Sequence, residues 1–211
     1  MQDAEYVWHR EVIAGPVERL LPELVKTRAL VSFYLAGGTG LALHLGHRSS
    51  VALDFFSSET FDPHALIPKL RELSGFTVVA KDEETLHAHI EGIRVSFLAY
   101  PYPMLFPQES FDEVQVAEAR DIACMKISAI AGRGTKRDFV DLYSASQLYG
   151  LAQLREWFKQ KFAPANYSMV HVLKSLTYFE GAEQDPMPDM LVPVAWEEVR
   201  RFFTTEVPRL L

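Results

Sequence analysis

The sequence predicts an α+β fold, in which a mixed β-sheet with helices on it is followed by a C-terminal helical region. Two observations lead to this prediction. Short apolar runs rich in strand-forming residues recur in the first half of the chain, and several begin or end at glycines. Beyond residue 117, longer stretches carry apolar residues at helical spacing. Strands that precede a series of helices are typical of α+β proteins.

The first quarter of the chain alternates between helix and strand signals. Residues 12–27 carry apolar side chains at helical spacing, and 29–35 form an apolar run of strand formers that stops at a glycine pair. The glycines indicate a strand-to-helix turn. We therefore expect a helix over 39–46 and a second strand over 51–56.

The next stretch predicts one helix and three strands. Residues 63–73 have apolar positions at helical spacing, while 75–80 and 85–90 have the composition of two strands in a hairpin. Another strand is expected over 92–99, beginning at a glycine. The proline-rich segment 101–107 is expected to be a loop. These strands together predict the mixed sheet.

The second half of the chain predicts helices separated by short breaks. The expected helices are 118–132, 135–149, 151–161, 166–178 and 195–204. Three prolines between residues 186 and 193 interrupt the chain before the last of them. We therefore expect an α/β domain over residues 1–110 and a helical domain over 111–211 that completes the functional site.

Composition and charge restrict the classes of protein. The chain has 211 residues, 48% of them hydrophobic, and a net charge of -7, which argues against a surface that binds nucleic acid throughout. Basic residues gather in 133–137, so a local positive site on an acidic protein is compatible with this charge. A lone cysteine, Cys124, indicates a reducing compartment.

Targeting signals are not recognised in the sequence. No apolar stretch approaches the roughly 20 residues that cross a bilayer, which predicts no membrane partner. Residues 1–12 lack the basic-then-apolar order of a secretion signal. We therefore expect the protein in the cytoplasm.

The first candidate site lies between Gly37 and Phe56. It consists of a glycine turn, a helix, a polar loop and a strand that carries Asp54. Glycines let backbone N–H groups and a helix N-terminus approach phosphates, although a glycine pair also occurs in ordinary tight turns. Two carboxylates at i and i+2 of a strand share a face and can bind Mg²⁺ together. The partner position, Ala52, has no carboxylate.

The second candidate site lies between Ile122 and Tyr143. Lys126 interrupts an apolar helical stretch, and Thr135 has the position of a helix N-cap with Asp138 three residues on. The basic residues that can bind a triphosphate or RNA phosphate are Lys126, Arg133, Lys136 and Arg137. Asp138 either orients Lys126 or acts as a base. A helix hairpin with a cap and surface ion pairs is the structural alternative.

In order and spacing, the blocks GGTGLALHLGHRSSVALDFF, GIRVSFLAYPYPML and DIACMKISAIAGRGTKRDFVDLY resemble the AbiEii/AbiGii nucleotidyltransferase toxin family. The resemblance covers about residues 10–205. It implies a polymerase-β-like nucleotidyltransferase sheet followed by a helical region. It also implies transfer of a nucleoside monophosphate from an NTP to a tRNA-like RNA or a protein, with Mg²⁺ or Mn²⁺ as cofactor and a cognate antitoxin as partner.

The resemblance assigns roles residue by residue. The glycine motif beside the nucleotide phosphates corresponds to Gly37, Gly38 and Thr39, and the polar loop after it to Arg48 and Ser50. Asp54 corresponds to the second acid of an Asp-x-Asp pair that binds the metal. Lys126 and Asp138 correspond to the lysine and acid of the later blocks, with Asp141 as a structural companion.

The sequence departs from the family pattern at Ala52, where the first acid is expected, and Ser96 replaces a third carboxylate. A bridge between two metal ions about 4 Å apart needs more than one carboxylate. Three explanations stay open: a divergent enzyme working with one metal, a nucleotide-binding protein without catalysis, and a deliberate Asp-to-Ala change. Two hypotheses on function follow, a nucleotidyltransferase impaired by Ala52, or a non-catalytic nucleotide-binding or toxin–antitoxin interaction module.

Overall fold

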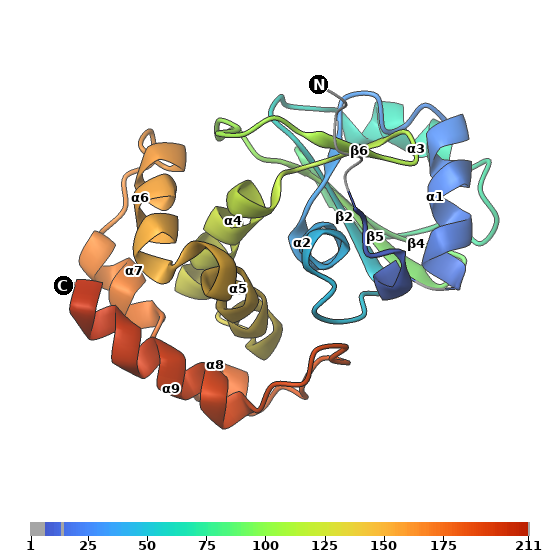
Figure 1. Ribbon diagram of the computed structural model, residues 1–211. Coiled ribbons are helices and arrows are strands. Elements are labelled where there is room, and N and C mark those ends of the chain that lie inside the picture. The colour runs from blue at the N-terminus through green and yellow to red at the C-terminus, as the bar shows by residue number, and fades with distance from the viewer. Residues whose placement is uncertain (1–6, 14, 211) are drawn as a thin grey trace, which may run out of the picture.

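The computed structural model describes residues 7–13 and 15–210, and a seven-stranded mixed sheet forms its centre. The strand order is β3-β4-β5-β2-β1-β7-β6. In Figure 1 the sheet lies to the right of helices α4 to α9. Strand β2 pairs in parallel with β5 and β1 with β7, whereas the other pairs are antiparallel. The strands are β1 Tyr34–Leu35, β2 Ala52–Ser57, β3 Thr77–Asp82, β4 Thr85–Ile90, β5 Ile93–Ala99, β6 Glu109–Phe111 and β7 Val114–Val116. The predicted mixed sheet is confirmed.

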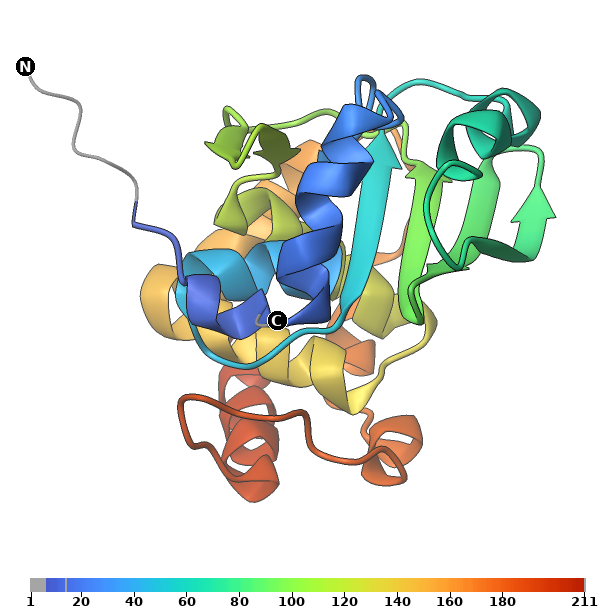
Figure 2. The same cartoon turned by 90° about the vertical axis from the view of Figure 1, so that its right-hand side faces the viewer.

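One face of the sheet is covered by helices α1 (Pro16–Lys26) and α3 (Pro63–Leu70) (Figure 2). Phe55 of β2 and Phe97 of β5 are fully buried in this layer with apolar side chains of both helices. Because side chains alternate along a strand, residues 52, 54 and 56 of β2 are turned to the other face. Burial of one face therefore determines which residues of β2 are turned toward α2 and the helical region.

The other face of the sheet is next to helix α2 (Gly37–Leu45) and a C-terminal helical region. This region consists of α4 Ala119–Gly132, α5 Lys136–Tyr149, α6 Leu151–Lys161, α7 Met169–Ser175, α8 Glu180–Glu183 and α9 Trp196–Glu206. Short 3₁₀ helices cover Arg10–Ile13 and Val207–Leu210. Apolar side chains of α2 and α4, including Leu41 and Ile122, join the two parts. No helix in the described part of the chain is long and apolar enough to cross a membrane.

Local signals account for where the elements begin and end. The side chains of Asp62, Glu118 and Thr135 accept backbone N–H groups in the first turns of α3, α4 and α5. Gly46, in the left-handed conformation with φ of 63°, ends α2. The predicted cap at Thr135 is thereby confirmed.

The structure corrects several boundaries. The strand expected over 29–35 is reduced to β1. The chain turns through a left-handed residue, Arg28, and residues 29–33 pack apolar side chains into the core without pairing with another strand. The hairpin of β6 and β7 was not expected. Its second strand, β7, lies beyond residue 110 and pairs with β1, so the sheet extends past the predicted boundary. The change from strands to helices therefore falls at Glu118, and division into two domains stays a prediction. Residues 1–6, 14 and 211 lie outside the described residues, and residue 14 is part of the helix expected over 12–27.

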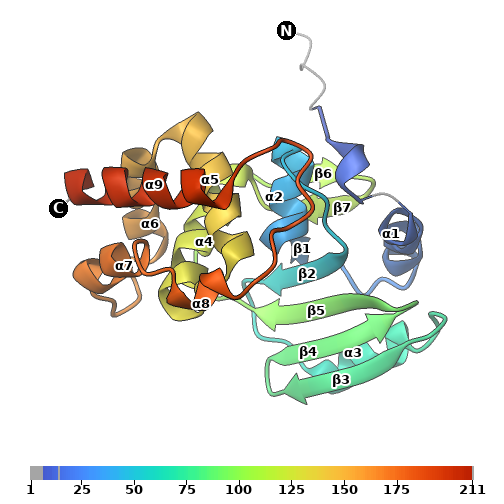
Figure 3. The ribbon, with the colours of Figure 1, turned by 90° about the horizontal axis from the view of Figure 1, so that it is seen from below.

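A segment near the C-terminus returns to the first part of the chain. Residues 186–193, here called the strap, join α8 to α9 and run alongside the loop after α2 (Figure 3). The backbone N–H of Ser49 donates to the carbonyl of Asp189 at 2.8 Å, and that of Leu191 donates to the carbonyl of His47 at 3.0 Å. Residues about 140 positions apart in sequence thus form one wall of the functional site.

Candidate functional site

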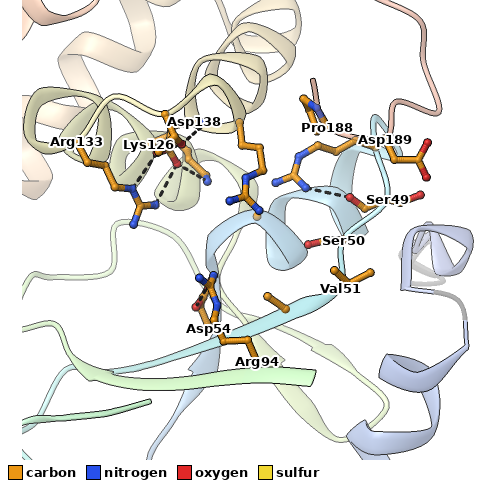
Figure 4. A pocket seen from close by; sticks show the side chains of 15 residues that line it. Ser49, Ser50, Val51, Asp54, Arg94, Lys126, Arg133, Asp138, Pro188 and Asp189 are labelled. Carbon is orange, nitrogen blue, oxygen red and sulfur yellow. Dashed lines mark hydrogen bonds and ion pairs between the residues drawn. The ribbon is translucent and has the colours of Figure 1, made fainter. Parts of the chain in front are cut away.

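A cleft of about 400 Å³ lies between the sheet and helices α4 and α5 (Figure 4). Its charged lining residues are Arg48, Asp54, Arg94, Lys126, Arg133, Arg137, Asp138 and Asp189. A neighbouring hollow of about 390 Å³ shares Gly38, Asp54, Arg94, Lys126 and Arg133 with it, and adds the apolar side chains of Phe56, Leu98, Tyr100 and Met125. We call these the charged end and the apolar end of one cleft.

The sheet side of the cleft comes from β2 and β5. Asp54 lies on the cleft face of β2, with its side chain 25% exposed, and Ala52 lies two residues before it. In the parallel pairing, β5 places Arg94 beside Ala52 and Ser96 beside Asp54. Arg94 Nη2 lies 3.9 Å from Asp54 Oδ1 (Figure 4). Ser96 Oγ is instead 3.1 Å from Nδ1 of His87.

The two glycines at the start of α2 each lie against a charged side chain. Gly37 has a φ of 61°, and a Cβ there would lie 2.9 Å from Asp54 Oδ2. A Cβ on Gly38 would overlap Nη2 of Arg48. The glycine turn expected beside phosphates therefore lies in the cleft, where it also leaves room for Asp54 and Arg48.

Thr39 and Ser50 connect α2 to the loop before β2. Their hydroxyl oxygens are 2.6 Å apart, and the Thr39 hydroxyl also donates to the carbonyl of Ala52. Thr39 is buried, whereas Ser50 lines the charged end of the cleft. Thr39 thus fixes the loop and strand, and Ser50 is the member of the pair that faces the cleft.

A buried carboxylate, Asp141 of α5, is the centre of a charged network below the cleft. It accepts two hydrogen bonds from the Arg48 guanidinium, at 2.6 Å from Nε and 2.9 Å from Nη2. Nε2 of His47 lies 2.8 Å away, and Nζ of Lys126 is 2.7 Å from its second oxygen. The polar loop after α2 and the lysine of α4 therefore share one carboxylate.

Asp138, one turn before Asp141, lies between the same lysine and an arginine. Its Oδ1 accepts from Lys126 Nζ at 2.9 Å and from Arg133 Nη2 at 3.2 Å, while Oδ2 accepts from Arg133 Nε at 3.0 Å. The Thr135 hydroxyl donates to Oδ2 at 2.6 Å. Both oxygens of this carboxylate thus accept from donors of α4 and of the turn between α4 and α5.

Opposite charges determine the protonation states of this network. Burial would raise the pKa of Asp138 and Asp141, but Lys126 and the neighbouring guanidinium groups hold both pKa values well below the ordinary range. Burial would lower the pKa of Lys126, but the two carboxylates raise it. All three groups are ionised at neutral pH. Asp138 holds Lys126 through this ion pair, and its role in a reaction stays a prediction.

The basic residues 133–137 divide between the cleft and the protein interior. Arg133 and Arg137 line the charged end of the cleft. Lys136 is buried, and its Nζ donates to the carbonyls of Asp185 at 2.6 Å and Glu183 at 3.4 Å. The structure therefore does not bring Lys136, an expected nucleotide-binding residue, into the cleft. At the N-terminus of α5, side chains one position apart point in different directions.

The carboxylates present do not fit a pair of metal ions. Asp54 faces the cleft, position 52 has a methyl group, and both oxygens of Asp138 bind cationic side chains. Among residues 7–13 and 15–210, no group of three or more His, Cys, Asp and Glu side chains is placed to hold a metal ion. Two-metal catalysis needs bridging carboxylates. A single Mg²⁺ or Mn²⁺ at Asp54 stays a prediction.

These features define a class of protein. A mixed sheet with an Asp-bearing strand beside a glycine turn, facing cations from a helical region, is the arrangement of nucleotidyltransferases. A putative nucleotidyltransferase of Helicobacter pylori has a similar fold, with a TM-score of 0.52, 16% identity and coverage of 92% of both chains. The nucleotidyltransferase toxin MenT4 of Mycobacterium tuberculosis also has a TM-score of 0.52, with 18% identity over 96% of this chain and 90% of MenT4.

Sequence comparison identifies the family. The model of the family described as "Nucleotidyl transferase AbiEii toxin, Type IV TA system" matches residues 19–108 and 93–209. An uncharacterized protein of Aquifex aeolicus is 36% identical over 197 residues, covering 90% of this chain and 94% of that protein. The chain therefore belongs to the AbiEii nucleotidyltransferase toxin family, as its glycine, Asp54 and Lys126 blocks predicted.

Sequence reasoning did not identify two parts of the site. Arg94 was not singled out, although it precedes Ser96 by two residues on a strand and therefore shares its face. The strap was treated as a break between helices, yet Pro188 and Asp189 line the cleft. The alternation along β5 contained a signal for Arg94, whereas a contact with the strap depends on tertiary structure.

Proposed function

We propose that this chain binds a nucleoside triphosphate in the cleft and transfers its nucleoside monophosphate to an RNA acceptor, at a rate limited by Ala52. One observation carries the proposal. Five cationic side chains, Arg48, Arg94, Lys126, Arg133 and Arg137, line the charged end of the cleft and outnumber its three carboxylates, in a chain whose net charge is -7. Such a concentration of positive charge beside a glycine turn suits a triphosphate.

The two ends of the cleft suit the two parts of a nucleotide. The charged end neutralises the phosphates, and the apolar end, with Tyr100 and Met125, accommodates the nucleoside. Asp54 lies where the two ends meet, since it lines both. The phosphate adjacent to the nucleoside, which is attacked in nucleotidyl transfer, would therefore lie at Asp54.

The chain's own residues contribute by orientation and charge neutralisation. Asp138 and Asp141 fix Lys126 before a ligand arrives, and Arg133 extends from Asp138 toward the cleft. Preorganised cations stabilise the charge that develops on a phosphoryl group during transfer. A tRNA-like acceptor follows from the family's implied activity, with a protein acceptor as the alternative. A cognate antitoxin is the proposed protein partner.

Transfer of label from each α-labelled NTP to total RNA, with Mg²⁺ present, tests this proposal. We expect weak labelling by this chain and stronger labelling by Ala52→Asp, because the substitution adds a second carboxylate at i-2 from Asp54. Asp54→Asn serves as the matched negative control. Equal labelling by Ala52→Asp and Asp54→Asn would contradict a role for this strand in transfer.

The missing carboxylate favours a second candidate function, a module that binds a nucleotide or an antitoxin without catalysis. The distinguishing result is NTP binding without transfer. Thermal stabilisation by NTP measures the binding, because a ligand that binds the folded state raises the melting temperature. If NTP stabilises both this chain and Ala52→Asp but neither labels RNA, the non-catalytic module is supported. A melting temperature that no NTP changes would contradict both candidate functions.

A further inference from the structure

Of the cleft cations whose ion pairs are described above, Arg94 has the longest ion pair. Its side chain is 54% exposed, and its contact with Asp54 is 3.9 Å long. Arg48 and Lys126, by contrast, are almost fully buried and bind Asp141 at less than 3 Å. A loose, half-exposed ion pair contributes little by itself, so the guanidinium of Arg94 is available to another anion.

The position of Arg94 relates it to the missing carboxylate. Arg94 is directly opposite Ala52 in the pairing of β2 with β5, and it lines both ends of the cleft. A carboxylate at position 52 would lie next to this guanidinium. With alanine at position 52, the charged residues on the sheet side of the cleft are one carboxylate, Asp54, and the cation that it contacts, Arg94. Asp54 and Arg94 together have no net charge, whereas a second carboxylate at position 52 would make the sheet side net negative. An anion that approaches this side without a divalent metal therefore meets less repulsion with alanine at position 52.

We propose that Arg94 binds the phosphates of the nucleotide at Asp54, so that this chain binds NTP without a divalent metal. The inference rests on the proposed function of the cleft and identifies how that cleft recognises its substrate. A guanidinium forms two parallel hydrogen bonds to a phosphate, a geometry that an ammonium group does not provide. Arg94 supplies charge and orientation on the sheet side, as Arg133 does on the helical side.

The first measurement is binding by calorimetry in EDTA and, separately, in excess Mg²⁺. The ligands are each of the four NTPs and inorganic tripolyphosphate, which reports on phosphate recognition without a base. We expect binding in EDTA within about threefold of that in Mg²⁺. In EDTA, Arg94→Gln should weaken binding about tenfold, the effect of a lost charged contact. Arg94→Lys should restore only part of it.

Two further variants make the test specific. Arg71→Gln removes an exposed arginine outside the cleft and should leave binding unchanged. Ala52→Asp places a carboxylate beside Arg94, so binding should weaken in EDTA and recover in Mg²⁺. Arg94 is more than half exposed, and melting without ligand should therefore show that Arg94→Gln folds normally.

The outcomes separate this inference from the proposed function. Binding that requires Mg²⁺, or binding in EDTA that Arg94→Gln leaves unchanged, would overturn the role of Arg94 while the cleft remains an NTP site. The absence of binding in both conditions would overturn the proposed function and the inference together. Metal-independent binding that Arg94→Gln weakens about tenfold and Arg71→Gln leaves unchanged would establish the role of Arg94.

Discussion

The two sides of the cleft are built differently. On the helical side, Lys126, Asp138 and Asp141 are buried and joined by hydrogen bonds of 2.7 to 2.9 Å. On the sheet side, Asp54 and Arg94 are partly exposed and 3.9 Å apart. The helical side is thus part of the protein's stability and is arranged before ligand binds. The ion pair of the sheet side contributes little to stability, so substitutions there should alter ligand binding with little effect on folding.

The largest expected effect is on the helical side. Asp141→Asn leaves Arg48 and Lys126 buried without their shared carboxylate, and breaking such a pair typically costs about 3–5 kcal/mol. Asp54→Asn on the sheet side should change the free energy of unfolding by less than about 0.5 kcal/mol. Urea denaturation of both variants measures the difference. Similar losses in the two would show that the sides do not differ in this way.

Acid should reveal the same asymmetry. The pKa values of Asp138 and Asp141 are lowered in the folded protein by their cationic neighbours, against the effect of burial. A carboxylate with a depressed folded pKa stabilises the protein above its unfolded pKa of about 4, and this stability is lost as pH falls through the folded pKa. We expect the free energy of unfolding to fall below about pH 4. The fall should be shallower in Asp141→Asn than in the unaltered chain.

A smaller effect is expected at the glycine turn of the sheet side. Gly37→Ala places a Cβ near Asp54 at a positive φ, and Gly92→Ala meets the same backbone strain with no atom within 4 Å. Both should lose about 1–2 kcal/mol of stability from the left-handed conformation. Gly37→Ala should in addition weaken NTP binding, as measured by calorimetry. Equal NTP affinity in the two variants would show that Asp54 tolerates the displacement.

The smallest effect is expected at the start of α5. Arg137→Gln should weaken NTP binding about threefold through one lost exposed charge, and leave stability within about 0.5 kcal/mol. Lys136→Gln should do the reverse, because its amine binds the carbonyls of Asp185 and Glu183 rather than the cleft. Binding and melting curves of both variants suffice. A loss of NTP affinity in Lys136→Gln greater than in Arg137→Gln would contradict the placement.

The sequence predicted the parts of this comparison that depend on local patterns. Alternation along the strand predicted that positions 52 and 54 share a face, and the cap at Thr135 put Asp138 on the first turn of α5. Partners across the fold were less accessible. The link from Arg48 to Asp141 spans 93 residues, and the orientation of Lys136 depends on carbonyls of residues 183–185. No local periodicity encodes contacts of this range.

The strap has a consequence for the time at which the cleft is completed during synthesis. A nascent chain that has emerged through α5 already contains Arg48, Asp54, Lys126 and Asp138. It lacks Asp189 and Leu191, whose backbones bind the loop after α2. Because chains emerge from the N-terminus first, the loop acquires this wall only after residue 191 has left the ribosome. A ribosome-bound intermediate that ends before residue 186 would therefore contain all the charged residues of the cleft except Asp189, and its cleft would lack the wall that the strap forms.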